Sequence, residues 1–121
     1  MRPTIADILQ ATAEEANVPL HHITLDRRLD YVIRIRHIAQ YLCRLYVDEH
    51  LSVIGREIGE RSGSMVTVAY QKISFDKKFY QETRSLIEDI EQNLRDKGFI
   101  LQEIERLLDN TFFKGENVYT P

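Results

Sequence analysis

Apolar residues recur along most of this chain with the three- and four-residue spacing of an α-helix. Apolar and polar residues nowhere alternate over the length of a strand, so the pattern predicts helices alone. The spacing is found in segments 4–16, 31–47, 51–58, 62–73, 77–96 and 99–108. We therefore predict an all-α fold of five or six helices around one core. That core should contain Ile8, Ile35, Ala39, Leu42, Ile54, Val66, Ala69, Ile73 and Leu86.

The two short segments at the centre, 51–58 and 62–73, have the pattern of a helix-turn-helix. Gly59 separates them, and glycine readily takes the left-handed conformation that ends a helix. In this motif the second helix enters the major groove of DNA and reads bases with its first residues. The residues at those positions are Ser62, Gly63, Ser64, Met65 and Thr67. A plain helical hairpin without a DNA-binding role has the same pattern, and the spacing alone leaves both interpretations open.

The charge of the chain is unevenly distributed. The net charge is −3 and the isoelectric point about 5.8, values that do not indicate a nucleic-acid partner by themselves. Residues 27–78, however, contain 10 Lys and Arg against 6 Asp and Glu, whereas residues 81–121 contain 5 against 9. The basic part includes the predicted helix-turn-helix. One side of the preceding helix suits either a DNA phosphate strand or plain solvent, and it carries Arg36, His37, Gln40 and Arg44.

The sequence lacks the features of an enzyme, a metalloprotein or a membrane protein. Its histidines do not have the spacing of metal ligands, and no phosphate-binding glycine loop or nucleophile motif occurs. The single cysteine, Cys43, excludes an intramolecular disulfide and lies in an apolar helical run, as a buried thiol would. No signal peptide or apolar stretch of about 18 residues is present. We expect a cytoplasmic, non-enzymatic protein with no cofactor, no metal and no membrane partner.

The middle of the chain resembles a known DNA-binding family. Residues 34–73 read RIRHIAQYLCRLYVDEHLSVIGREIGERSGSMVTVAYQKI. This stretch is similar to the carboxy-terminal DNA-binding domain of the bacterial replication initiator DnaA. In that domain a helix with an arginine–glutamine pair precedes a Leu-Pro-x-Ile-Gly helix and a recognition helix that opens with Arg-Asp-His-Thr-Thr-Val. The likeness begins upstream, at PTIADILQATAEEANVPLHHITLDRR, and continues to about Leu94, roughly three quarters of the chain.

The resemblance implies a helix-turn-helix of the DnaA C-terminal, Trp-repressor-like type, and we expect a free-standing relative of that domain. Arg28 takes the place of a basic-loop arginine that enters the minor groove. Arg36 and His37 take the place of the arginine–glutamine pair near the DNA backbone. Other backbone-contacting positions correspond to Arg44, Ser52, Arg61 and Lys72.

The base-reading positions depart from the family. The Asp-His-Thr-Thr of the recognition helix is replaced by Ser62, Gly63, Ser64 and Met65. The aspartate and the histidine that bond to base edges are therefore missing. The phosphate-binding positions match the family better than the base-reading positions do.

The resemblance also divides the chain into two parts. We expect residues 1–97 to form the DnaA-like domain, and residues 98–121 to add a C-terminal helix and an aromatic tail. These additions would either pack on the domain or associate with a second copy. The implied function is binding of double-stranded DNA, sequence-specific or general, in replication initiation or transcription regulation. The alternative is a helical protein-interaction module that has lost base reading.

Overall fold

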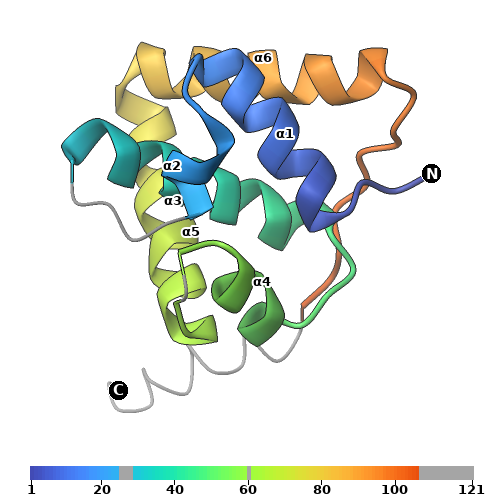
Figure 1. Cartoon of the computed structure of the whole chain (residues 1–121), viewed down its shortest axis with the longest axis horizontal. Helices are drawn as coiled ribbons and strands as arrows, with labels where there is room; N and C mark the ends of the chain where they lie inside the picture. The colour runs from blue at the N-terminus through green and yellow to red at the C-terminus, as the bar shows by residue number, and fades with distance from the viewer. Residues whose placement is uncertain (25–28, 60, 107–121) are drawn as a thin grey trace.

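The structure is a computed structural model that describes residues 1–24, 29–59 and 61–106. These residues form six helices and no strand, which confirms the predicted all-α fold (Figure 1). The helices are α1 (Ile5–Ala16), α2 (Leu20–Thr24), α3 (Asp30–Tyr46), α4 (Leu51–Glu57), α5 (Gly63–Phe79) and α6 (Gln81–Asp96). Within the same ranges, no helix is both long enough and apolar enough to cross a lipid bilayer.

The centre of the fold is α3, because α1, α2, α4 and α5 all pack against it. Of the predicted core residues all are buried except Leu86, which is half-buried and packs against the core. Cys43 is fully buried in α3, as expected, and burial raises the pKa of its thiol. Full burial of one leucine or isoleucine side chain contributes about 1.5–3 kcal/mol. This contiguous core therefore holds α4 and α5 firmly against the rest of the domain.

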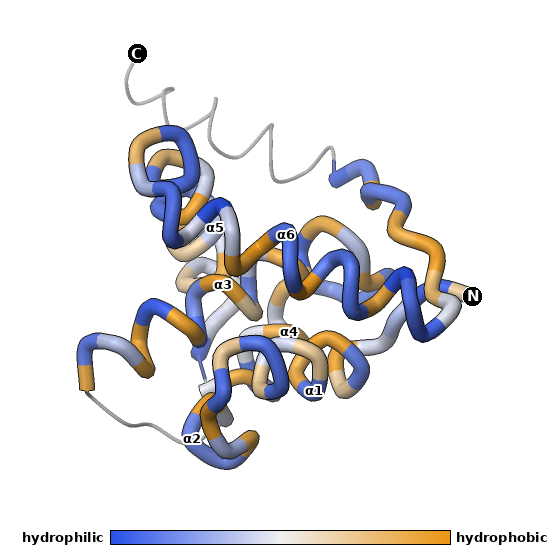
Figure 2. Tube along the Cα trace, turned by 90° about the horizontal axis from the view of Figure 1, so that it is seen from above, coloured by the Kyte–Doolittle hydropathy of each residue, from blue (hydrophilic) through white to orange (hydrophobic). Residues whose placement is uncertain are grey.

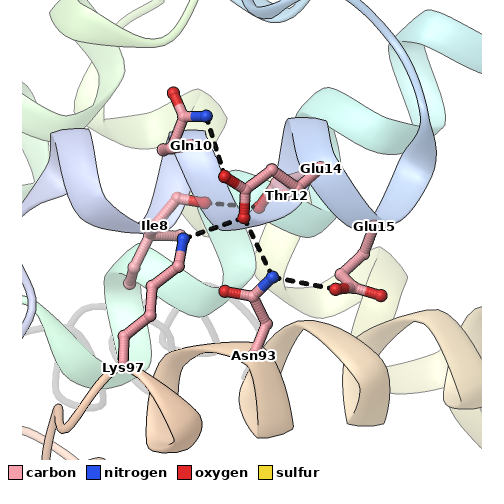
Figure 3. A network of polar contacts seen from close by, with 7 residues as sticks. All are labelled: Ile8, Gln10, Thr12, Glu14, Glu15, Asn93 and Lys97. Atoms are coloured by element: carbon pink, nitrogen blue, oxygen red, sulfur yellow. Dashed lines mark hydrogen bonds and ion pairs between the residues drawn. The ribbon is translucent and has the colours of Figure 1, made fainter.

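A polar network joins α1 to α6 on the side of the fold away from α4 (Figures 1 and 3). The carboxylate of Glu14 accepts hydrogen bonds from Gln10 at 3.0 Å and from Asn93 at 3.0 Å, and pairs with Lys97 at 2.8 Å. Asn93 also donates to Glu15 at 2.8 Å. Lys97, with the two amide donors, holds the pKa of Glu14 at about 2. The network connects the first helix to the last one.

The boundaries of the later helices differ from the predicted ones. The predicted break at residues 74–76 is wrong, because α5 continues through it to Phe79. Asp76, within this stretch, pairs with Lys72 one turn earlier at 3.7 Å. Tyr80, the residue that follows the helix, has an extended backbone with φ of −118° and ψ of 112°. A short helix, α2, also forms between the predicted helical segments 4–16 and 31–47.

The predicted helix over residues 99–108 is not present in residues 99–106, and residues 107–121 lie outside the described ranges. The end of α6 explains why the chain changes direction. Gly98 takes a left-handed conformation with φ of 96°, and the N–H of Phe99 donates back to the carbonyl of Leu94 at 3.0 Å. This is the arrangement that commonly terminates a helix at glycine.

Beyond that turn, backbone N–H groups that would bond within a helix donate instead to carbonyl groups far away in the sequence. The N–H of Ile100 donates to the carbonyl of Met1 at 2.9 Å, and that of Ile104 to the carbonyl of Leu45 at 2.7 Å. Leu101 packs against the core. Residues 99–106 therefore present no apolar helix face.

Candidate nucleic-acid interface

The helix-turn-helix is formed by α4, α5 and the turn between them. α4 ends at Glu57, and Gly59 follows in a left-handed conformation with φ of 81°, as the sequence predicts. The hydroxyl of Ser62 then caps α5 by accepting the N–H of Met65 at 3.3 Å. These local signals set the start of α5 at Gly63.

The turn packs closely on α4. The N–H of Arg61 donates to the carbonyl oxygen of Gly55 at 2.6 Å. A Cβ atom added at Gly55 would overlap the carbonyl oxygen of Arg61 and would lie 2.6 Å from that of Ser62. Only a residue without a side chain fits this approach. The angle between α4 and α5 therefore depends on Gly55.

Two long polar side chains of α3 support the turn from inside. Gln40 donates to the carbonyl of Ile58 at 2.9 Å. The guanidinium of Arg36 donates through Nε to the carbonyl of Ile23 in α2 at 3.0 Å. Arg36 is 2% exposed and lies directly under Gly59, where an added Cβ would be 2.7 Å from the arginine Cδ. Contrary to our expectation, this placement does not suit contact with DNA phosphates.

Arg44 and Thr67 are also turned inward, and each is 7% exposed. The guanidinium of Arg44 lies over the ring of Tyr70, 3.7 Å from its centroid, and Tyr70 stacks on Tyr41. Such a cation–π contact is strengthened when it is shielded from water. The hydroxyl of Thr67 donates to the carbonyl of Gly63 at 3.4 Å. Like Arg36, both residues are therefore buried in internal contacts and are not placed to meet DNA.

Most of the other predicted contacts lie at the surface of the motif. The exposed ones are Ser52, Ser62, Ser64, Met65 and Lys72, while Arg61, Gly63 and His37 are half-buried. Arg28 lies outside the described residues. A hollow of about 240 Å³ separates α3 from the start of α5, and it is lined by Ile33, Arg36, His37, Gln40, Arg61 and Met65. The structure thus gathers His37, Arg61 and Met65 at one place.

The charge around this hollow is positive. The pKa of His37 is lowered, first by burial and then by the positive charges of Lys72, Arg36 and Arg61, while Asp76 partly opposes them. His37 is therefore neutral at neutral pH, and its surroundings repel a further positive charge. The same potential attracts an anion such as a phosphate group.

Two exposed residues on the outer face of α5 were not predicted from the sequence as possible DNA contacts. Val68 is 49% exposed and Gln71 is exposed, one and two turns beyond Ser64. They belong with Met65 and Lys72 to the side of α5 that faces away from the core. Spacing of three and four residues from Ser64 could have identified them, but an apolar residue such as Val68 is usually assigned to a core.

Comparison with known families agrees with this geometry. The family described as bacterial dnaA protein helix-turn-helix matches residues 5–73, which is more than half of the chain. The match begins with α1 and extends into α5, so it contains α4, the turn, the first part of α5 and the α3 that supports them. The helix-turn-helix of this family is a DNA-binding module related to replication initiation rather than a catalytic one. By this match, the chain belongs to the family of the bacterial DnaA helix-turn-helix.

Proposed function

We propose that this protein binds double-stranded DNA by placing the outer face of α5 in the major groove, in the control of replication or transcription. The observation that carries the proposal is the exposed start of α5. Ser64 and Met65 stand at the surface, just after the cap formed by Ser62, while the turn beside them is fixed against α3. Recognition helices of this motif present their first residues to base edges in the same way.

The phosphate contacts we propose lie on both sides of that helix start. Lys72 on α5 and Ser52 on α4 are exposed, and Arg61 lies in the turn between the two helices. His37 and the backbone N–H groups at the start of α5 can add neutral hydrogen bonds to phosphate oxygens. The family resemblance adds Arg28 as a minor-groove contact.

Fluorescence anisotropy with a labelled random duplex, repeated over a salt series, tests the proposal. The logarithm of affinity should fall linearly with the logarithm of salt concentration, with a slope of about −0.9 for each phosphate neutralised. Lys72→Ala should weaken binding and make the slope less steep by about one phosphate. The matched control is Lys97→Ala, which removes a lysine from the α1–α6 network and should leave both quantities unchanged. An absence of binding at the lowest salt, or an equal effect of the two substitutions, would contradict the proposal.

One observation favours a second function, that of a protein-interaction module. Phe75, Phe79 and Tyr80 at the carboxyl end of α5 are 58%, 65% and 56% exposed. Exposed aromatic residues grouped in this way are common at protein interfaces. This function takes precedence if the duplex does not bind at the lowest salt. If the duplex does bind, Phe79→Ser should leave its affinity unchanged, because the residue lies four turns beyond the start of α5.

A further inference from the structure

The outer face of α5 is apolar where a base-reading helix usually carries hydrogen-bonding groups. Met65 is 41% exposed and Val68 is 49% exposed, and they lie one turn apart on the same side. The opposite side is fully buried and carries Val66, Ala69 and Ile73. The tube of α5 in Figure 2 carries both hydrophobic and hydrophilic residues. Met65 and Val68 therefore do not belong to the hydrophobic core.

The hydrogen-bonding side chains near this pair are mostly occupied by the backbone of α5. The hydroxyl of Ser62 accepts the N–H of Met65, and the hydroxyl of Thr67 donates to the carbonyl of Gly63. Gly63 has no side chain to offer. Ser64 is left to bond to a base edge over the first turn of the helix, and a lone hydroxyl distinguishes bases poorly because it both donates and accepts.

The charges around the pair favour a polyanion over an apolar protein partner. Met65 lines the same hollow as His37 and Arg61, where the surrounding charge is positive. Lys72 follows Val68 by one turn on the outer face and is exposed. In the major groove of DNA, a base edge could contact the apolar groups of this surface, and the flanking phosphates could contact its positive groups.

The major groove presents one apolar group, the 5-methyl group of thymine. On the basis of the DNA binding proposed above, we propose that Met65 and Val68 form an apolar reading surface that selects thymine methyl groups. Sequence preference then comes from methyl contacts instead of the aspartate and histidine hydrogen bonds of the family. Gln71, one turn beyond Val68 on α5, can bond to the adenine of an adjacent base pair.

Removing the methyl groups from the DNA tests this inference directly. The full chain is titrated with two duplexes of one A·T-rich sequence, one with thymidine and the other with deoxyuridine in its place. Deoxyuridine keeps the base-pairing and groove hydrogen-bonding groups and lacks only the methyl group. We expect the deoxyuridine duplex to bind about fourfold more weakly for each methyl group contacted. In the reverse experiment, replacing cytosine by 5-methylcytosine in a G·C-rich duplex should raise the affinity.

Protein variants show whether these two side chains are the readers. Met65→Ala and Val68→Ala should each reduce the ratio of affinities for the two duplexes toward one. The matched control is Phe75→Ala, which removes an exposed apolar side chain farther along the same helix and should keep the wild-type ratio. All three residues are exposed, and circular dichroism checks that each variant is folded.

The outcomes separate this inference from the proposed function. Equal affinity of the wild type for both duplexes refutes methyl reading while duplex binding itself still stands. A preference for thymidine that persists in Met65→Ala and Val68→Ala also refutes it, because the methyl groups would then act through DNA shape or other residues. Failure to bind either duplex at the lowest salt refutes DNA binding as well.

Discussion

The inner and outer faces of the helix-turn-helix use their side chains in opposite ways. On the inner face, where α3 supports the motif, the long polar chains of Arg36, Gln40 and Arg44 are buried and bond to the backbone or lie against a tyrosine ring. On the outer face of α5, the side chains of the first two turns are short or apolar, as in Ser64 and Val68. The polar residues that most resemble a DNA-binding family are thus partly structural. A family-like arginine in this fold can preserve the shape of the motif without contacting DNA.

The largest effect on this difference between the two faces should come from removing a buried arginine of the inner face. Arg36→Ala should destabilise the protein by about 3 kcal/mol, because it leaves the carbonyl of Ile23 without this donor and creates a cavity under Gly59. Urea denaturation measures the change. Arg34→Ala, an exposed arginine of the same helix, is the control and should change stability by less than about 0.5 kcal/mol. If Arg36→Ala is as stable as the wild type and has lost DNA affinity, the inner face is a DNA contact after all.

The close contact between α4 and the turn should show the next largest effect. Gly55→Ala places a methyl group against the carbonyl oxygens of Arg61 and Ser62. We expect a loss of about 2 kcal/mol, since overpacking costs about 1–3 kcal/mol and the better helix propensity of alanine offsets part of it. The midpoint of urea denaturation reports the loss.

The control for this variant is Ser52→Ala, at an exposed position earlier in α4, which should be nearly neutral. A Gly55→Ala protein of unchanged stability would show that the turn moves freely. In that case the fixed geometry of the outer face, on which base reading depends, would not hold.

Much of the fold was predictable because its helix ends carry local signals. Thr4 and Asp7 form a reciprocal cap, Gly59 is left-handed, and Ser62 caps α5, all within a few residues of the element that they end or start. Core positions followed from helical spacing alone. The helix expected after Gly98 did not form, because its N–H groups bond to distant carbonyls that no local pattern reveals.

The candidate site was less predictable for the same reason. Whether an arginine points inward depends on partners far away in the sequence, such as Ile23 for Arg36 and Tyr70 for Arg44. Spacing places both arginines on one side of α3 and does not tell whether that side is covered. Val68 was missed because an apolar residue in a helix usually belongs to the core.

A smaller effect should distinguish capping from base reading at the start of α5. Ser62→Ala removes the acceptor for the N–H of Met65 and should lower stability by about 1 kcal/mol. Ser64→Ala, two residues later and exposed, should change stability by less than about 0.5 kcal/mol. Thermal or urea denaturation of the two variants gives the comparison. Equal effects would mean that Ser62 does not act as the cap and is available to read a base.

The smallest effect concerns His37, which lies at the boundary between the two faces. Burial and the charges of Lys72, Arg36 and Arg61 lower its pKa below the usual 6.5, against the opposing charge of Asp76. The unfolded chain therefore binds the proton more tightly than the folded one. Stability from this group is complete above about pH 6.5 and decreases as the pH falls below that value.

Replacing His37 with glutamine, which stays neutral, should consequently flatten the decrease in unfolding free energy between about pH 7 and pH 5. Urea denaturation at several pH values measures that slope. The carboxylate of Glu14 does not interfere, because its contribution is lost only as the pH falls below its unfolded value of 4.5 toward a folded pKa of about 2. If the wild type and His37→Gln lose stability in parallel, the imidazole is not held neutral by its neighbours. The positive potential proposed to attract DNA phosphates at this end of α5 would then lack its support.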